Sequence, residues 1–282
     1  MTAIATNKLK RFFVNKLFED IGDSNQRYYL GIGESQDWDS SDTPPIPVQS
    51  AKEERNARTK LQSIKSAETF SFVVPRHNWI SGTTYEAFDD SLASQTNYYV
   101  FTDENKVYMC LQQGKNAAGV AVTSTVKPTG TTTKPFSTGD GYVWKFLYAL
   151  SATRASNFLS ANFVPVEKVL DSSELGRALN VTEQTQDAVQ TAAVPGQVIG
   201  VAVTNGGTGY TSAPTVTIDG DGVRAAATAT VSGGAVVKIE LDSSTDSAIT
   251  MGQGYNFASV SIAAPSGSGT TATARAILGP DS

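Results

Sequence analysis

Apolar residues near the start of the chain recur at intervals of three and four positions, the spacing of an amphipathic helix. This pattern predicts a helix from about residue 9 to residue 21, with Thr6 as N-cap and Gly22 after its end. A second, mostly polar helix is predicted over residues 51–64, because Ser50 and Glu53 have the spacing of a capping box. The apolar positions of the first helix are Leu9, Phe12, Phe13, Leu17, Phe18 and Ile21.

Segments rich in β-branched and aromatic residues alternate with turn residues through the first two thirds of the chain, which predicts a mostly β structure. The segment between residues 114 and 138 is rich in Thr, Gly, Lys and Pro, and we expect it to be exposed and mobile. Within the last strand the aromatic residues alternate with other types, so Trp144 is predicted to lie in the core. The predicted strands are 27–33, 69–74, 97–102, 106–112 and 142–150.

The last part of the chain contains an internal repeat. Gly207-Thr-Gly209-Tyr210 recurs 45 positions later as Gly252-Gln-Gly254-Tyr255, and Val216 and Ile218 recur 44 positions later as Val260 and Ile262. A strand-like run precedes each Gly-x-Gly-Tyr motif, so each unit is predicted to be three short strands. In this part of the chain, small Ala and Thr residues alternate at positions where large side chains would normally fill a core. The pattern predicts that residues after about 194 form a thin lobe.

Composition changes sharply near residue 194. Tyr210, Tyr255 and Phe257 are the only aromatic residues after that point, and Arg224, Lys238 and Arg275 are the only basic ones. We therefore predict two domains, a β domain with two helices over residues 1–193 and a Gly-rich repeat β domain over 194–282. The predicted fold class is mostly β, a two-lobed β-sandwich type with an N-terminal helix, one short helix and a C-terminal Gly-Tyr repeat lobe.

Charge and composition narrow the classes of partner and of site. The formal net charge is −5 and the isoelectric point is near 5.0, so a nucleic-acid partner is not expected. One cysteine and one histidine allow neither an internal disulfide nor a structural zinc site. No run of about 18 apolar residues is present, so we expect no membrane span, and the basic and polar residues of the N-terminus argue against a signal peptide.

Catalytic and ligand-binding motifs are scarce. His77 follows a predicted strand and would suit acid or base chemistry, but no Gly-x-Ser-x-Gly motif accompanies it, and a hydrogen-bonded loop histidine is the favoured interpretation. Cys110 is predicted to be an inert core thiol. The Asp37, Asp39 and Asp42 cluster lacks the spacing of a calcium loop, and Asp219-Gly-Asp-Gly222 is interpreted as a hairpin turn. We expect no enzyme activity, no cofactor and no small-molecule substrate.

Four aromatic-rich segments carry a resemblance to a known family. The segments are Tyr28-Tyr-Leu-Gly-Ile-Gly33 with Trp38, Val74-Pro-Arg-His-Asn-Trp79, Tyr108-Met-Cys-Leu111 and Gly139-Asp-Gly-Tyr-Val-Trp-Lys-Phe-Leu147, and Asn162-Phe-Val-Pro165 extends the match. Their order and spacing resemble the baseplate wedge protein of T-even-type contractile-tailed bacteriophages, the subunit called gene product eight, over about residues 10–170. The Gly139-Asp-Gly-Tyr-Val-Trp144 run is the most specific part, and the Gly-Tyr repeat departs from the family's second half.

The resemblance implies a structural virion protein, made in the host cytoplasm and located in the tail baseplate. It further implies a homodimer that contacts other baseplate wedge subunits and acts in baseplate assembly and tail contraction. The alternative from another class is a receptor- or glycan-binding tail module, and a hydrolase would rest on His77 alone. Arg76 is expected to stack on the Trp79 indole, to clamp a carboxylate, or to be an ordinary surface arginine. The candidate interface residues are Phe12, Phe13, Phe18, Trp38, Arg76 and Trp79.

Overall fold

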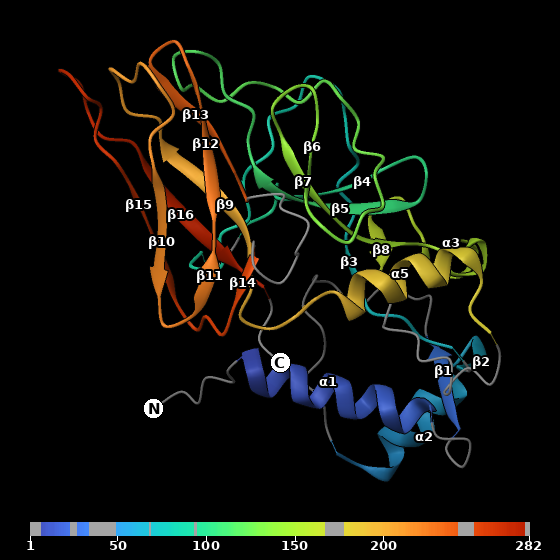
Figure 1. The fold of residues 1–282 in the computed structure, drawn as a ribbon. Helices are drawn as coiled ribbons and strands as arrows, with labels where there is room; N and C mark the ends of the chain where they lie inside the picture. Colours follow the sequence, from blue (N-terminus) through green and yellow to red (C-terminus); the bar gives the residue numbers. More distant parts are fainter. Residues whose placement is uncertain are drawn as a thin grey trace. The chain divides into compact units, whose positions relative to one another are not determined.

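The computed structural model describes residues 7–22, 27–33, 49–67, 69–92, 95–166, 178–241 and 251–279. Over these residues the chain is mostly β, with four helices and several small antiparallel sheets (Figure 1). The chain divides into two compact units, Met1–Ser71 and Phe72–Ser282. We refer to them as the N-terminal unit and the main unit.

The N-terminal unit contains helices α1 (Asn7–Gly22) and α2 (Ala51–Thr59) and the antiparallel strands β1 (Tyr28–Ile32) and β2 (Ser63–Ala67). The predicted first helix and first strand are confirmed. The Ser50 hydroxyl accepts a hydrogen bond from the Glu53 backbone N–H at 3.2 Å, so the predicted cap is present. The second helix ends at residue 59 rather than 64, because the residues from 63 onward pair with β1 as a strand.

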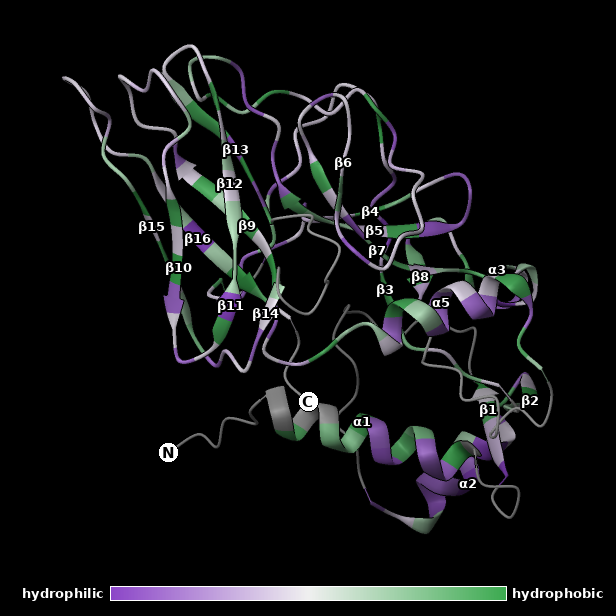
Figure 2. Ribbon diagram, in the orientation of Figure 1, coloured by the Kyte–Doolittle hydropathy of each residue, from purple (hydrophilic) through white to green (hydrophobic). Residues whose placement is uncertain are grey.

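Apolar side chains of the N-terminal unit remain exposed. Along α1, hydrophobic and hydrophilic residues interleave (Figure 2). Phe12 is 54% exposed and Phe13 is 61% exposed, and Leu30 and Ile64 on the two strands are also exposed. Among the described residues of this unit none is buried, and the first buried side chain along the chain is that of Tyr85. The described part of the N-terminal unit therefore has no apolar core of its own.

A four-stranded antiparallel sheet lies at the centre of the aromatic core of the main unit. The predicted strands at 97–102, 106–112 and 142–150 are confirmed, with ends that differ by up to two residues. The first two form a hairpin whose turn places Asn105 at a φ of 58°, a left-handed conformation that asparagine tolerates. In spatial order the strands are β4 (Tyr99–Phe101), β5 (Lys106–Gln112), β7 (Val143–Ala149) and β6 (Phe136–Ser137).

Both faces of β7 are buried. Trp144, Phe146 and Tyr148 are buried on one face, as predicted for Trp144. On the opposite face Val143 packs with Leu111 and Ile199 in a second apolar cluster. This cluster contains residues from before and after position 194 of the sequence. The alternation in the sequence indicated one buried face, and the second is buried because strands that come later in the chain cover it.

Two helices and one short strand pair complete this part of the main unit. The strand predicted at 69–74 is β3 (Val73–Pro75), which is shorter and pairs with β8 (Phe163–Pro165). Helices α3 (Ala152–Phe158) and α5 (Val181–Thr191) correct the prediction of one short helix after the first. Ser151 caps the start of α3, and Asn180 caps the start of α5. Neither helix has a long apolar stripe, so the spacing of apolar residues in the sequence did not predict them.

The segment between residues 114 and 138 is less exposed than predicted. Ser124 is fully buried, its backbone pairs with Thr83, and its hydroxyl accepts a hydrogen bond from the Trp79 indole at 3.1 Å. The Asp140 carboxylate accepts from the Ser124 hydroxyl at 3.0 Å and from the backbone N–H groups of Thr125 and Val126 at 2.8 and 2.9 Å. These bonds fasten the middle of the segment to the turn before β7.

Three long strand pairs form the C-terminal part of the main unit. β9 pairs with β16, β12 with β13 and β10 with β15, all antiparallel, and a short β11–β14 pair accompanies them. β15 also lies beside β16 and β13 beside β9, so these strands surround a shared apolar core. The strands are β9 (Val198–Asn205), β10 (Val216–Gly220), β11 (Val223–Ala225), β12 (Ala227–Ser232), β13 (Ala235–Leu241), β14 (Met251–Gln253), β15 (Ala258–Ile262) and β16 (Thr273–Leu278).

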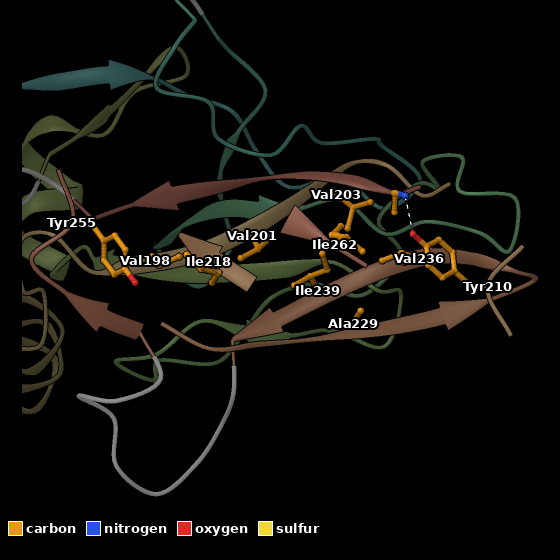
Figure 3. Packing of buried hydrophobic residues seen from close by; sticks show 11 residues of the cluster. Val198, Val201, Val203, Tyr210, Ile218, Ala229, Val236, Ile239, Tyr255 and Ile262 are labelled. Carbon is orange, nitrogen blue, oxygen red and sulfur yellow. Dashed lines mark hydrogen bonds between the residues drawn. The ribbon is translucent and has the colours of Figure 1, made fainter. Parts of the chain in front are cut away.

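The glycines of the two Gly-x-Gly-Tyr motifs have similar φ values. Gly207 and Gly209 have φ values of 64° and 83°, and Gly252 and Gly254 have 66° and 77°, all in the left-handed region that favours glycine. The backbone N–H of each motif tyrosine donates to a glycine carbonyl at 3.0 Å, that of Gly234 for Tyr210 and of Gly196 for Tyr255. Figure 3 shows the two tyrosines at opposite ends of the apolar core.

The domain boundary predicted near residue 194 falls inside the main unit. Leu111 and Val143 before it share a cluster with Ile199 and Ile277 after it, and Gly200 lies close to the Leu111 side chain. A Cβ at Gly200 would be 3.1 Å from the Leu111 Cβ, so the strands approach closely there. That residues 1–193 and 194–282 fold as separate domains stays a prediction, and any separation must break this cluster.

Candidate functional site

A cavity of about 320 Å³ lies between the four-stranded sheet and the C-terminal strands. Strand β5 and the start of β7 contribute to one side of it, and β9, β12 and β13 contribute to the other. This volume is at the lower end of the range found for small-molecule sites, about 300–1,000 Å³. Its apolar lining includes Leu111, Val143, Ile199, Ile239, Leu241 and Met251.

Gln112 is a polar lining residue at the end of β5 and is 2% exposed. Its side-chain oxygen accepts a hydrogen bond from the Ile239 backbone N–H at 3.2 Å, which ties β5 to β13. Its side-chain nitrogen is buried and has no hydrogen-bond partner within the described parts of the chain. A buried amide donor without a partner costs about 1–3 kcal/mol, so this nitrogen would gain from an acceptor.

Glu240 lines the same cavity, but neighbouring side chains occupy both of its oxygens. The Ser137 hydroxyl donates to one oxygen, and Lys238 Nζ lies 2.8 Å from the other. Burial by itself raises the pKa of Glu240, and the hydrogen bonds from Lys238 and Ser137 outweigh it, so the net pKa is lowered. Glu240 is therefore ionised at neutral pH, and Lys238 balances its charge.

Lys134 and Thr228 complete the polar side of the cavity. In the residues that the structure describes, no carboxylate lies within 4.0 Å of Lys134 Nζ, whereas Lys106, Lys127 and Lys238 each have such a partner. Thr228 is exposed and stands opposite Glu240 in the β12–β13 pair. The cavity thus combines an apolar interior with a net positive polar side.

The sequence-predicted interface residues lie in different places. Phe12 and Phe13 are exposed on α1, with ring centroids 5.9 Å apart, and Phe18 on the same helix is half-buried. Trp38 lies outside the described residues, so its predicted role stays a prediction. Phe12 and Phe13 remain interface candidates because their rings are exposed.

Arg76 and Trp79 lie in the main unit, between β3 and the four-stranded sheet. The Arg76 guanidinium lies over the Phe101 ring at 5.1 Å and donates to the Asn78 side chain at 2.8 Å and to the Ser160 carbonyl at 3.0 Å. The stacking partner is thus Phe101 rather than the predicted Trp79 indole. Trp79 is half-buried and packs against the aromatic cluster of the sheet.

The aromatic-rich segments that carry the family resemblance in the main unit meet in one cluster. Tyr142 and Trp144 are stacked, with centroids 5.6 Å apart and an interplanar angle of 16°. Tyr108 and Cys110 from β5 belong to the same buried cluster, and Trp79 packs against it. Burial raises the pKa of Tyr142 to about 12, so its hydroxyl stays protonated and donates to the Val122 carbonyl at 2.6 Å. These segments form a core.

His77 has structural contacts. Its ring lies edge-on to Tyr99 at 5.0 Å, and its carbonyl accepts from the Phe101 backbone N–H at 2.7 Å. Cys110 is fully buried, and burial raises the pKa of its thiol, as expected for an inert core residue. Asp221 lies between β10 and β11, and its carboxylate accepts hydrogen bonds from the backbone N–H groups of Asn256 and Phe257 at 2.9 and 3.2 Å. The predicted hairpin is wrong, because β10 pairs with β15 and β11 pairs with β14 rather than with each other.

The described residues contain neither a metal-binding cluster nor a membrane-spanning helix. Within the described residues no three His, Cys, Asp or Glu side chains are grouped so that they could hold a metal ion. Asp37, Asp39 and Asp42 lie outside those residues. No helix in the described part of the chain is both long and apolar enough to cross a membrane.

Comparison with known proteins gives no assignment, since neither a protein-family model nor a curated protein matches this chain. The cavity residues Gln112, Lys134 and Glu240 were missed in the sequence analysis. They come from strands and loops far apart in the chain, and no spacing pattern connects them. Gln112 gives one weak signal, since it is an amide at the end of an otherwise apolar strand.

Proposed function

We propose that the chain is a structural subunit of a phage tail baseplate wedge, acting in baseplate assembly and tail contraction within the virion. The observation that carries the proposal is the convergence of the resemblance-bearing segments 74–79, 108–111 and 139–147 on one aromatic cluster. Residues that resemble a structural family and also build a core favour a structural role over a catalytic one.

The proposed role requires no enzyme activity and no cofactor. His77 contacts Tyr99, and Cys110 is fully buried, so neither is arranged as an activated nucleophile or base in the described residues. Changing His77 to Ala should therefore remove no activity. A turnover on an ester or glycan substrate that disappeared in His77→Ala would contradict this part of the proposal.

The proposed partners are a second copy of the chain and other baseplate wedge subunits. Support comes from the N-terminal unit, whose described residues include exposed Phe12, Phe13 and Leu17 and no buried side chain. Large exposed apolar side chains on the described part of this unit favour association. A stable interface would bury at least about 1,200 Å² with a few large residues at its centre. Nucleic acid, membrane and small-molecule substrates are not among the proposed partners.

The finer features of the fold are also part of the proposal. We infer that the strands of the main unit form sandwich-type lobes and that the two Gly-x-Gly-Tyr units are a structural repeat. The equal glycine φ values, the equivalent tyrosine hydrogen bonds and the pairing of β10 with β15 support a repeat. The shared cluster of Leu111, Val143 and Ile199 supports close packing of the two lobes.

A receptor- or glycan-binding tail module is the second candidate function. The cavity of about 320 Å³ favours it as a site for a terminal group of the receptor or glycan, because ligand sites are concave, largely apolar and lined by a few polar groups. A structural subunit does not need such a cavity. The two functions differ in the class of partner that they require.

Assembly measurements distinguish the two candidates. The wedge proposal expects the purified chain to self-associate in sedimentation equilibrium and to form stable complexes when co-expressed with other tail proteins. The second candidate expects binding to bacterial surface polysaccharide by a chain that ignores those proteins. A chain that stays monomeric at high micromolar concentration and binds polysaccharide alone would overturn the wedge proposal.

A further inference from the structure

We propose that the cavity between the four-stranded sheet and the C-terminal strands binds a small carboxylate with an apolar body. The inference rests on the lining of the cavity and does not depend on the wedge proposal. The carboxylate would lie at the polar side formed by Lys134 and Gln112, and the apolar body would lie against the residues of β5, β9 and β13.

The charges at the cavity favour an anion over a cation. Glu240 is the one acidic lining residue, and Ser137 and Lys238 already occupy its two oxygens. Lys134 lines the cavity without a carboxylate within 4.0 Å among the described residues. A ligand carboxylate would supply the missing counter-charge, and a charge-assisted hydrogen bond is stronger than a neutral one.

The amide of Gln112 gives a second, independent reason. Gln112 is 2% exposed, and its side-chain nitrogen has no hydrogen-bond partner in the described chain, while its oxygen is held by Ile239. The oxygen is fixed as an acceptor by that bond, so the nitrogen remains a donor. This nitrogen has less than 1 Å² of accessible surface, so the Gln112 side chain must shift toward the cavity before a ligand can reach it. The ligand must then accept a hydrogen bond, as a carboxylate does and an ammonium group does not.

The remaining lining sets the size and the character of the ligand. Leu111, Val143, Ile199 and Met251 are buried apolar residues that line the cavity, so contact with them favours a hydrocarbon group. A volume of about 320 Å³ accommodates a short aliphatic or aromatic acid and excludes a long polymer from the interior. An extended polysaccharide is therefore a different ligand from the one proposed here.

The test is a titration of the full chain with hexanoate in an isothermal titration calorimeter. Hexanol keeps the apolar body without the charge, and acetate keeps the charge without the body. We expect hexanoate to bind at least about tenfold more tightly than either, the ratio that one charge-assisted hydrogen bond supplies. Equal binding of hexanol and hexanoate would overturn the role of Lys134 and Gln112.

Three variants locate the site. Lys134→Met should weaken hexanoate binding at least about tenfold, and Thr228→Trp should block the exposed side of the cavity. Lys127→Met is the matched control, since Lys127 pairs with Asp103 and Glu104 and does not line the cavity. Thermal unfolding of each variant confirms that it folds. Absence of hexanoate binding at millimolar concentrations, or unchanged binding in folded Lys134→Met, would overturn the proposal, whatever the assembly measurements show.

Discussion

Thr217 lies directly opposite Ser261 in the antiparallel pair of β10 and β15. These two residues occupy the same place in the two Gly-Tyr units, 44 positions apart in the sequence. On either side the partners exchange, with Val216 opposite Ile262 and Ile218 opposite Val260. A two-fold relation between the units would produce this register, in which the central residue faces its own counterpart.

The second glycine of each motif provides a matched pair of substitutions. Gly209 and Gly254 have similar φ values, but a Cβ at Gly209 would lie 2.3 Å from the Ser268 carbonyl oxygen, and a Cβ at Gly254 would meet nothing within 4 Å. Gly254→Ala should lower the free energy of unfolding by about 1–2 kcal/mol through backbone strain alone. Gly209→Ala should cost at least about 1 kcal/mol more, because the backbone must also shift. If urea unfolding shows that the two variants lose the same free energy of unfolding, the crowding at Gly209 is relieved at no cost in stability.

Asp140 should stabilise the loop before β7. Burial alone raises the pKa of this carboxyl, but hydrogen bonds from Thr138, Val126, Thr125 and Ser124 outweigh burial and lower it below the ordinary value of 3.8. A lowered native pKa adds stability at neutral pH, and this stability is lost as the pH falls below about 4 toward the native pKa.

Asp140→Asn should therefore lower the free energy of unfolding by about 1–3 kcal/mol at pH 7, the cost of weakening hydrogen bonds to a charged group. Urea unfolding of wild type and variant at pH 7 and at pH 3 measures this difference, which should shrink at the lower pH. Asp103→Asn serves as the control, because Asp103 is exposed and pairs with Lys127 at the surface. If the difference in unfolding free energy between wild type and Asp140→Asn is the same at pH 7 and pH 3, the ionised carboxylate of Asp140 is not the source of the stability.

Phe13 should contribute to self-association. Its ring is exposed on α1 beside Phe12, and an aromatic residue at the centre of an interface contributes about 2 kcal/mol or more. Phe13→Ala should weaken association roughly thirtyfold in sedimentation equilibrium. Val181→Ala is the control, because Val181 is an exposed apolar residue at the start of α5. A comparable effect of both substitutions would indicate non-specific association.

The predicted boundary near residue 194 should be the first site of limited proteolysis. Residues 191–195 form a continuous exposed run after α5. Because Leu111 and Val143 pack with Ile199, the two fragments should stay associated after cleavage and elute together in gel filtration. Resistance of this run, with cleavage elsewhere, would count against two domains.

Cys110 should be inaccessible to thiol reagents in the folded chain. The side chain is fully buried, and burial raises its pKa, so the reactive thiolate is disfavoured at neutral pH. Modification by an aromatic disulfide reagent at pH 8 should be slow in buffer and complete within the mixing time in denaturant. Rapid modification without denaturant would show that the sheet opens locally.

Short-range patterns predicted the first helix and three strands of the central sheet, β4, β5 and β7, but not β6, which lies in the segment predicted to be an exposed loop. The Ser50–Glu53 spacing marked the start of α2, but its end was wrong because pairing with β1 converts residues 63–67 into a strand. The cavity was not predictable, since Gln112 and Glu240 are brought together by pairing and packing between distant strands. Burial of Val143 was likewise hidden, because Ile199, which packs against it, comes some fifty positions later in the chain.

Pairing between β9 and β16 sets the order in which the C-terminal part can fold during synthesis. β9 starts at residue 198, and its hydrogen-bonded partner β16 does not begin until residue 273. The apolar residues Val198, Val201 and Val203 therefore leave the ribosome well before the strand that pairs with them. Until β16 has been made, β9 presents an unpaired strand edge, which is the kind of surface that promotes aggregation. Truncation shortly before residue 273 should therefore yield an aggregating product rather than a shorter soluble one.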